Sequence, residues 1–428
     1  MTDWKKSGTT IMSMKKTMFD LVIVGGGAAG MFAAALAGEQ GRRVLLFEKN
    51  ERLGRKLAIT GKGRCNVTNA CQPEEVLKNV PRNARFLYSS VFGFPPERVM
   101  EFFETHGCPL KIERGNRVFP RSDQSADVIA ALERGISNGK VTRRRETVRE
   151  LLTENGSITG IRTDQGVTQC ACVLLCTGGM SYPATGSTGD GYRMAQKLGH
   201  TIQPTSGSLV PLTSDDPACA QMQGLSLRNT ALRLVDEKGK TAFEDFGELL
   251  FTHFGISGPM ALSASAHCKE GTSYVIQLDL KPALDETRLD ARFLRDFEKY
   301  CNRSMENALA DLFPHSMIPV LLERAQIDPC MQANSLSRQQ RHRLLEQTKR
   351  FTLPISGTRP IEEAIITRGG ICVKEVDPKT MQSRLVKGLY FAGEILDCDA
   401  YTGGFNLQIA WSTAHAAVNG MAFPGNDL

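Results

Sequence analysis

The chain has 428 residues, of which 41% are hydrophobic, and carries a formal net charge of +6 at pH 7. A chain of this length buries a sizeable core and is expected to form about two or three domains. It contains no uninterrupted apolar run of about 18 residues, so the sequence predicts no membrane-spanning helix. The mild positive charge permits an anionic substrate or an RNA partner and requires neither.

The first 17 residues, MTDWKKSGTTIMSMKKT, are basic and lack an apolar stretch of signal-peptide length, and we expect a disordered extension there. Twelve cysteines occur in the chain. Without a secretory signal they predict reduced thiols and a cytoplasmic protein. Cys170, Cys172 and Cys176 lie in the apolar segment CACVLLC, which favours a buried strand over a metal site, and we expect no metal.

The clearest motif is a βαβ unit near the start, in which FDLVIVGGGAAGMFAAALAGEQG is followed by the strand-like RVLLFEKN. In its pattern Gly25-x-Gly27-x-x-Gly30, the first glycine allows a tight turn, the second lets the backbone approach a pyrophosphate, and the third lets the helix pack against the strand. Glu48 closes the second strand and is placed to accept hydrogen bonds from ribose hydroxyls. This acid favours an unphosphorylated ribose, as in NAD or FAD.

The pattern changes along the rest of the chain. Residues 80–140 look helical, and short alternating runs over 206–283 predict a small antiparallel barrel or sandwich. The period is helical again over 284–350. The C-terminal segment reads as a strand, glycine turns and a long apolar helix, so we expect the C-terminus to complete the nucleotide fold and the middle of the chain to be an insertion.

Two basic segments, residues 141–150 and 338–350, are candidates for an RNA-binding surface. Each also has the acids or the helical period of an ordinary solvated surface, and this second interpretation is favoured for the 338–350 helix.

Five motifs, in order along the chain, resemble the BaiN-like FAD-dependent oxidoreductases. They are VIVGGGAAGMFAAALA with Glu48, GRKLAITGKGRCNVTN, LLCTGGMSYPATGSTGDGY, LFTHFGISGP and GLYFAGEILDCDAYTGGFNLQIAWSTA. That family includes members assigned as bile-acid pathway reductases, as ribosomal RNA dihydrouridine synthases and as aminoacetone oxidases. The resemblance implies FAD as cofactor and an α/β fold, with a discontinuous, Rossmann-like FAD domain of the glutathione-reductase type. It also implies an inserted β-barrel-like domain that carries a helical subdomain.

The domain boundaries expected from this resemblance follow the changes in pattern. The predicted segments are a disordered extension at 1–17, the FAD domain at 18–205 and 366–428, the barrel-like domain at 206–283 with a return at 351–365, and the helical subdomain at 284–350.

The resemblance also implies a cofactor site, in which Gly393 and Glu394 lie along the pyrophosphate and the ribityl chain. Gly403 and Gly404 stand directly before a helix, whose free N–H groups and positive dipole end would stabilise negative charge on a reduced flavin. The full predicted cofactor set is Gly25, Gly27, Ala28, Ala29, Gly30, Glu48, Lys49, Arg55, Lys56, Gly63, Arg64, Cys65, Asn66, Thr177, Gly178, Gly179, Gly393, Glu394, Gly403, Gly404, Phe405 and Asn406.

The reaction we expect is reduction of an activated C=C bond, such as that of a steroid-like enone, with NAD(P)H as electron donor. A side chain or water must then protonate the neighbouring carbon. The candidates are His253, Tyr182, Tyr401 and Cys65, and His253 is preferred because its ordinary pKa lies nearest neutrality.

Three other functions stay open. They are reduction of a uridine in ribosomal RNA, oxidation of a small amine by oxygen, and a non-enzymatic flavin-bearing module. A disulfide reductase is disfavoured because Cys65 and Cys71 are spaced Cys-x5-Cys and the sequence shows no second dinucleotide fold. A small-molecule substrate is the expected partner, and the sequence does not fix the oligomeric state.

Overall fold

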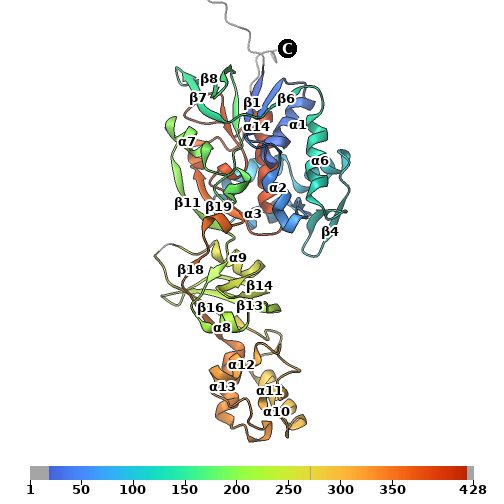
Figure 1. Ribbon diagram of the computed structural model, residues 1–428, viewed down its shortest axis with the longest axis vertical. Helices are drawn as coiled ribbons and strands as arrows, with labels where there is room; N and C mark the ends of the chain where they lie inside the picture. Colours follow the sequence, from blue (N-terminus) through green and yellow to red (C-terminus); the bar gives the residue numbers. More distant parts are fainter. Residues whose placement is uncertain (1–18, 270, 422–428) are drawn as a thin grey trace, which may run out of the picture.

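The computed structural model describes residues 19–269 and 271–421, so the extension predicted for residues 1–17 lies outside the described residues. Figure 1 shows three units stacked along the long axis of the molecule. We call them the parallel-sheet domain, the barrel and the helical subdomain.

The parallel-sheet domain is built on five parallel strands in the order β20-β10-β1-β2-β6. Its central strands are fully buried, which explains why they read as short continuous apolar runs. One edge strand comes from near the C-terminus, as the sequence predicts. The strands are β1 (Leu21–Val24), β2 (Val44–Phe47), β6 (Val141–Arg144), β10 (Val173–Leu175) and β20 (Leu389–Phe391).

Helices cover this sheet, and the first and last of them pack together although they lie at opposite ends of the chain (Figure 1). Trp411 of the last helix is fully buried and lies 5.4 Å from the ring of Phe32 in the first. The helices of the domain are α1 (Ala28–Glu39), α2 (Arg55–Ile59), α3 (Pro73–Lys78), α4 (Tyr88–Gly93), α5 (Pro96–Thr105), α6 (Ser125–Ile136), α7 (Asp190–Lys197) and α14 (Phe405–Gly420).

Small antiparallel sheets complete the domain. In one of them, of order β3-β5-β4, the strands β4 and β5 lie within the stretch expected to be helical, because residues 110–120 form a hairpin between α5 and α6. A two-stranded sheet, β11-β19, spans the predicted boundary at residue 205. These strands are β3 (Thr68–Asn69), β4 (Leu110–Glu113), β5 (Arg117–Pro120), β7 (Val148–Glu154), β8 (Ser157–Thr163), β9 (Gly166–Gln169), β11 (Ile202–Ser208) and β19 (Ile366–Ile371).

The barrel is a seven-stranded antiparallel sheet of order β17-β16-β13-β14-β15-β12-β18. Its two edge strands are separated in the chain by Ser356 alone, so the sheet must curl until its edges almost meet. Its elements are β12 (Leu212–Thr213), β13 (Ser226–Asp236), β14 (Thr241–Thr252), β15 (Gly255–Ser257), β16 (Tyr274–Asp279), β17 (Phe351–Ile355), β18 (Gly357–Thr358), α8 (Pro217–Gln221) and α9 (Pro259–Ser265).

The helical subdomain continues the core of the barrel, because buried residues of both belong to one apolar cluster. Leu289, Phe293 and Phe297 point into it, as their spacing predicts. Within residues 19–269 and 271–421, no helix is long and apolar enough to cross a membrane. The subdomain consists of α10 (Glu286–Lys299), α11 (Met305–Ala308), α12 (Ile318–Ala325) and α13 (Arg338–Lys349).

Candidate flavin site

A cavity of about 1250 Å³ opens at the carboxyl ends of β1, β10 and β20. The segments that directly follow these three strands line it, which is the place where open α/β sheets bind ligands. It continues past them to Leu250 and Leu262 of the barrel. The volume exceeds the range of about 300–1,000 Å³ that is typical of small-molecule sites, so a dinucleotide and a second molecule can be accommodated together.

The glycine turn after β1 has the geometry that its sequence predicts. Gly25 has φ +107°, and a Cβ there would overlap the carbonyl of Cys176. A Cβ on Gly30 would overlap the carbonyl oxygen of Gly25, so Gly30 serves the packing of helix on strand and does not line the cavity. The Cβ position of Gly27 meets no atom within 4 Å. Because Gly27 lines the cavity, this open side faces the space for a ligand.

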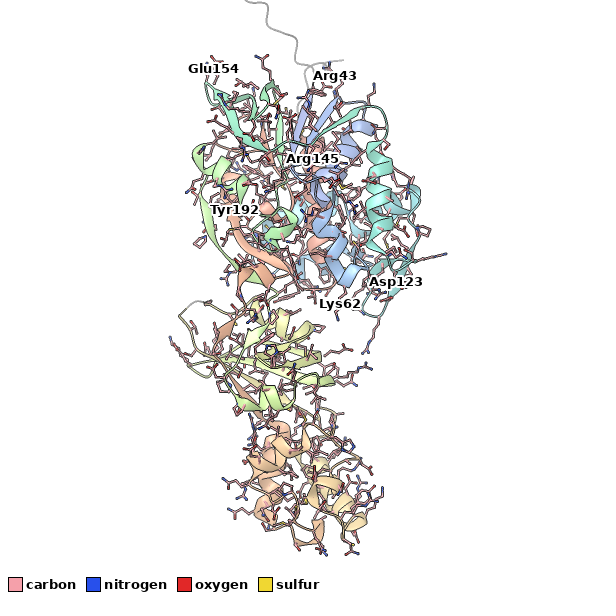
Figure 2. The ribbon with its side chains drawn as sticks, viewed as in Figure 1. Arg43, Lys62, Asp123, Arg145, Glu154 and Tyr192 are labelled. Atoms are coloured by element: carbon pink, nitrogen blue, oxygen red, sulfur yellow. The ribbon has the colours of Figure 1, made fainter. Side chains whose placement is uncertain are left out.

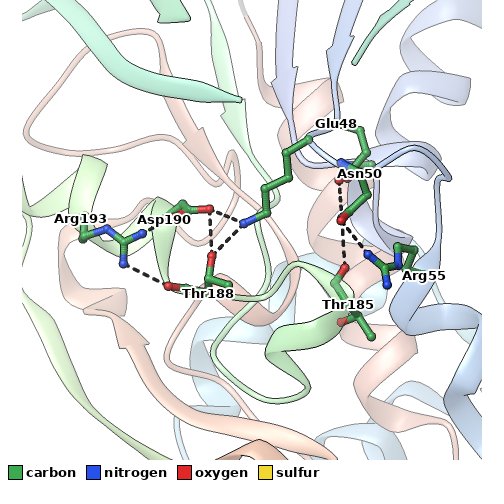
Figure 3. A network of polar contacts seen from close by, with 9 residues as sticks. Glu48, Asn50, Arg55, Thr185, Thr188, Asp190 and Arg193 are labelled. Atoms are coloured by element: carbon green, nitrogen blue, oxygen red, sulfur yellow. Dashed lines mark hydrogen bonds and ion pairs between the residues drawn. The ribbon is translucent and has the colours of Figure 1, made fainter. Parts of the chain in front are cut away.

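Glu48 ties this turn to the end of β2. Its Oε2 accepts a hydrogen bond of 2.7 Å from the backbone N–H of Gly26, and its Oε1 accepts bonds from the backbone and the side chain of Asn50 (Figure 3). A carboxylate oxygen accepts two hydrogen bonds, so Oε2 retains the capacity to accept one from a ribose hydroxyl.

Lys49 and Arg55, two cationic residues of the predicted cofactor set, each interact with another side chain of the protein. Nζ of Lys49 lies 2.5 Å from Oδ2 of Asp190, and Nη1 of Arg55 donates to the side-chain oxygen of Asn50 at 2.8 Å (Figure 3). Burial is the largest single influence and opposes ionisation of Asp190, but the bond and charge of Lys49, together with Thr188 and Arg193, leave the pKa of Asp190 below its usual value. Both cations line the cavity, and they fix its wall.

The N-terminus of α14 forms another part of the wall. Gly403 and Gly404 have φ of 124° and 100°, which residues with a side chain rarely adopt, and they deliver the chain into the helix. Phe405 and Asn406 also line the cavity. The Asn406 side chain accepts a hydrogen bond from the N–H of Ala400 and donates one to its carbonyl, so it shapes the loop before the helix.

Two buried polar atoms in the cavity wall fit a cofactor. Among the described residues, neither Oγ1 of Thr177 nor Oδ1 of Asn66 has a hydrogen-bond partner. Such atoms are costly to bury without a partner, and both belong to residues that line the cavity. Together with the open side of Gly27 and two helix N-termini, they form a donor and acceptor set that fits FAD.

The loop at residues 59–69 contributes less than its sequence suggests. Lys62, Arg64 and Asn66 line the cavity, whereas Gly63 and Cys65 do not. The Arg64 guanidinium is held by ion pairs with two carboxylates of its own domain. Gly63 and Cys65 thus lie outside the cavity lining, and their contacts with a cofactor stay a prediction.

The structure gives no support to Cys65 as a proton donor, because it is fully buried and its burial raises the pKa of the thiol to about 12. Burial likewise raises the pKa of Cys71 to about 11. Both cysteines are free thiols, so the structure gives no support to a redox pair.

Gly179 is the remaining predicted residue that does not line the cavity. A Cβ there would overlap Oγ1 of Thr367 on β19, so this glycine serves packing between segments. The predicted residues that line the cavity are Gly25, Gly27, Ala28, Ala29, Glu48, Lys49, Arg55, Lys56, Arg64, Asn66, Thr177, Gly178, Gly393, Glu394, Gly403, Gly404, Phe405 and Asn406.

The candidate proton donors separate by position. His253 is exposed in the turn between β14 and β15 and does not line the cavity, so the structure gives no support to the preference for it. Tyr182 and Tyr401 both line it. The hydroxyl oxygen of Tyr401 lies 2.6 Å from Nε2 of His267, at the edge of the barrel. Sequence analysis missed His267, which lies in ASAHCKE with no motif around it.

The basic helix α13 is tied into the fold. Arg341 pairs with Asp290 at 2.7 Å, and Lys349 pairs with Asp279 at 2.6 Å. These two ion pairs support the interpretation of α13 as an ordinary structural surface over that of an RNA-binding face. Within residues 19–269 and 271–421, no group of three His, Cys, Asp or Glu side chains is arranged to hold a metal.

Known proteins resemble this chain over nearly its whole length. Residues 19–420 match the family described as HI0933-like protein Rossmann domain. The chain is 33% identical over 405 residues to "Ribosomal RNA dihydrouridine synthase" of Escherichia coli (strain K12), covering 93% of this chain and 96% of that protein. It is 32% identical over 402 residues to "3-dehydro-bile acid delta(4,6)-reductase" of Clostridium scindens, covering 92% and 97%.

A solved structure with the same fold is that of 3-ketosteroid delta1-dehydrogenase from Sterolibacterium denitrificans, with a TM-score of 0.51 and 14% identity, covering 94% of this chain and 99% of that one. This likeness shows the fold alone. The family match spans more than nine-tenths of the described residues and agrees with the motifs. The chain therefore belongs to the HI0933-like family, the BaiN-like group of FAD-dependent oxidoreductases.

Proposed function

We propose that the protein is an FAD-dependent reductase that reduces a C=C bond conjugated to a carbonyl, with NAD(P)H as electron donor. The observation that carries this proposal is a continuous cavity that runs from the glycine turn after β1 to the barrel. Two relatives support it by their names, 3-dehydro-bile acid delta(4,6)-reductase and ribosomal RNA dihydrouridine synthase. Each name describes the reduction of a C=C bond in a ring.

In this proposal, the turn at Gly25 and Gly27 and the N-terminus of α1 hold the pyrophosphate. Glu48 accepts a hydrogen bond from the ribose through Oε2. Thr177 and Asn66 gain the hydrogen bonds that their buried oxygens lack within the described part of the chain. Held by these residues, FAD would supply hydride transfer between the nicotinamide and the substrate.

The barrel contributes apolar side chains to its end of the cavity, beside Glu248 and Ser257. Leu250 on β14 and Leu262 on α9 line it from the barrel side, and Leu209 and Ile366 line it where β11 and β19 pair. Apolar walls exclude water and strengthen electrostatic interactions within the site. They suit the hydrocarbon skeleton of an enone, so we place the substrate between this end and the N-terminus of α14.

Anaerobic photometry of the purified flavoprotein tests the proposal. We expect NADH or NADPH to bleach the visible flavin band, and an α,β-unsaturated steroid ketone to restore it. If neither nicotinamide bleaches the flavin, the proposed donor is wrong. If no unsaturated ketone and no unmodified ribosomal RNA restores the band of the reduced flavin, the proposed reaction is wrong.

Reduction of a uridine in ribosomal RNA is the second candidate. The observation that favours it is a basic rim, by which we mean the exposed side chains of Lys62, Arg114 and Arg117 among the residues that line the cavity. Figure 2 shows Lys62 at the end of the parallel-sheet domain that faces the barrel. Phosphates of a bound RNA loop would meet positive charge at this rim while one base enters the cavity.

Salt dependence of RNA binding tests this second candidate. We expect affinity for ribosomal RNA to fall steeply with salt, and the double variant Arg114→Gln, Arg117→Gln to reduce the logarithmic slope by about 2. Arg338→Gln, an exposed position on α13, serves as control and should leave the slope unchanged. Binding that is weak and insensitive to salt would contradict this function.

Two remaining functions give different results in the same photometry. A small-amine oxidase would release hydrogen peroxide in air with the amine and without added nicotinamide. A flavin-bearing module without activity would keep its flavin oxidised with either nicotinamide and with the amine.

A further inference from the structure

The barrel places a histidine against the one candidate proton donor that lies at its side of the cavity. Tyr401 belongs to the loop before α14, and His267 follows α9. Oη of Tyr401 and Nε2 of His267 are 2.6 Å apart. Among the described residues, the Tyr401 hydroxyl forms a hydrogen bond with His267 alone. This hydrogen bond joins the parallel-sheet domain to the barrel.

Ring stacking fixes the position of the histidine. Phe243 of β14 stacks on His267, with centroids 4.9 Å apart and planes inclined by 25°. The ring of Tyr401 lies 5.8 Å from both of the other rings. Hydrogen bonds within the parallel-sheet domain also hold Tyr401. Its backbone N–H donates to the carbonyl of Asn79, and the Asn406 side chain donates to the carbonyl of the preceding residue, Ala400. The pair is therefore pre-organised.

We propose that Tyr401 is the catalytic residue that protonates the substrate carbon, and that His267 is a positioning residue that donates its Nε2–H to the phenolic oxygen. This inference rests on the proposed reductase function. With the histidine as donor, the phenolic O–H is free to point into the cavity. In the opposite arrangement, the phenolic hydrogen would point at the histidine and could not reach a substrate.

The charges around the pair agree with these roles. Burial, together with the positive charges of Arg82 and Arg368, lowers the pKa of His267, which keeps its ring neutral; Asp399 opposes this shift. Burial and the carboxylates of Asp399 and Asp245 raise the pKa of Tyr401, with Arg82 opposing, which keeps the phenol protonated. A neutral imidazole has one N–H to donate, and a protonated phenol has a proton to give.

The proton balance of the step is simple. The O–H bond of Tyr401 breaks as a C–H bond forms at one carbon of the former double bond, while the other carbon receives the hydride and its two electrons from the proposed flavin reaction. The phenolate that remains accepts the hydrogen bond from His267 and lies near the Arg82 guanidinium, which is paired with Asp399. Water protonates it after the product leaves.

The other candidates do not offer this arrangement. The backbone of Tyr182 is bonded to Glu362 and Thr185, but within the described part of the chain no hydrogen bond holds its hydroxyl, so nothing orients its proton as His267 orients that of Tyr401.

Titration of Tyr401 tests the inference independently of turnover. Carbon NMR of the FAD-loaded protein with isotope-labelled tyrosine follows the phenol, and Tyr401→Phe identifies its signal. We expect His267→Phe, which keeps the stacked ring and removes the N–H, to raise the pKa of Tyr401 by about one unit, because the phenolate loses its donor. His267→Gln, which can still donate from its amide, should return the pKa towards the wild-type value. An unchanged or lowered pKa in His267→Phe would overturn the role of His267.

A kinetic measurement tests Tyr401 itself. The flavin is reduced with dithionite, and its reoxidation by an α,β-unsaturated steroid ketone is followed anaerobically. We expect Tyr401→Phe to slow reoxidation by about 10²- to 10⁴-fold, the usual contribution of a general acid, and to leave flavin reduction by the nicotinamide unchanged. Tyr88→Phe, which removes the hydroxyl of an exposed tyrosine outside the cavity, serves as matched control.

The two failures are distinguishable. If the wild-type reduced protein is reoxidised by neither the ketone nor ribosomal RNA, the proposed function is wrong, and the NMR titration still decides whether His267 donates to Tyr401. If the wild type is reoxidised and Tyr401→Phe is equally fast, the proposed function stands and the inference is overturned.

Discussion

Lys56 and Glu394, which are 338 positions apart in the chain, form an ion pair in which Nζ of Lys56 lies 2.6 Å from Oε2 of Glu394. Nζ also donates to Oγ of Ser181 at 2.5 Å, and the backbone N–H of Thr367 donates to Oε1 of Glu394 at 2.9 Å. Four distant segments thus meet at one carboxylate in the wall of the cavity. The lysine neutralises a charge that would otherwise repel a pyrophosphate.

We expect Lys56→Met to weaken both the fold and the cofactor site. The two side chains are 20% and 13% exposed, so the glutamate would be left largely buried and unpaired. The loss is expected to be about 2 kcal/mol of unfolding free energy, below the cost of breaking a fully buried pair. Urea unfolding and titration of the apoprotein with FAD measure the two effects.

Lys62→Met is the matched control for this change. Lys62 lines the same cavity but is exposed, and it forms no ion pair with any described residue. Its replacement should leave stability within about 0.5 kcal/mol of wild type. Equal effects of the two substitutions would show that the Lys56 ion pair has no special role.

Gly27→Ala is expected to reduce FAD binding without unfolding the protein. Gly27 has φ −84°, which alanine adopts without strain, and its added Cβ would meet no protein atom within 4 Å. The methyl group would instead occupy cavity space where we place the pyrophosphate. We expect FAD affinity to fall at least about tenfold, which corresponds to about 1.4 kcal/mol.

Thermal unfolding of the apoprotein checks that Gly27→Ala is folded. Gly93→Ala, at the exposed end of α4, also adds a methyl group into open space but lies outside the cavity lining, and it should bind FAD normally. Normal FAD affinity in Gly27→Ala would mean that the pyrophosphate does not pass this turn.

Local patterns in the sequence were enough to predict much of the fold. The first βαβ unit, the paired strands around Gly239 and the alternating face of Tyr274, Ile276 and Leu278 all depend on neighbours in sequence. The return of the chain to the parallel sheet at β20 was also predicted, since a strand followed by a helix repeats the first pattern.

Features that depend on distant partners could not be predicted in this way. His267 acquires its role from Tyr401, 134 positions later in the chain, and no spacing rule connects the two. Gly63 and Cys65 belong to a glycine-rich loop that suggests a cofactor wall, but the side on which each residue lies depends on left-handed backbone angles that the sequence does not show.

Buried His200 is expected to make stability depend on pH. Its Nε2 lies 2.8 Å from Oγ of Ser383 and its Nδ1 lies 3.1 Å from Glu375, and burial lowers its pKa although Glu375 opposes the shift. Because the folded-state pKa lies below the unfolded one, the unfolded chain binds more protons as the pH falls. The stability contribution is therefore complete above about pH 6.5 and is lost as the pH falls towards the lowered value.

His200→Gln should flatten this dependence, because glutamine keeps polar contacts but does not take up a proton. Urea unfolding at several pH values measures the slope. His253→Gln, at an exposed position outside the core, should retain the wild-type slope. A slope in His200→Gln as steep as in wild type would assign the dependence to other groups.

Arg341→Gln is expected to destabilise the helical subdomain and to leave RNA binding unchanged. The Arg341 side chain is 17% exposed, and its Nε lies 2.7 Å from Oδ1 of Asp290, so this ion pair joins α13 to α10. Its loss should cost about 1 kcal/mol of unfolding free energy, since the aspartate is partly exposed to water. Arg338→Gln on the same helix removes an exposed charge that pairs with no carboxylate within the described part of the chain, and should cost less.

If α13 were an RNA-binding face, the exposed Arg338 would contribute more to the salt dependence of binding than Arg341, whose guanidinium is already paired with Asp290. Equal salt slopes for wild type and both variants, with a stability loss confined to Arg341→Gln, would therefore identify the basic charge of α13 as structural.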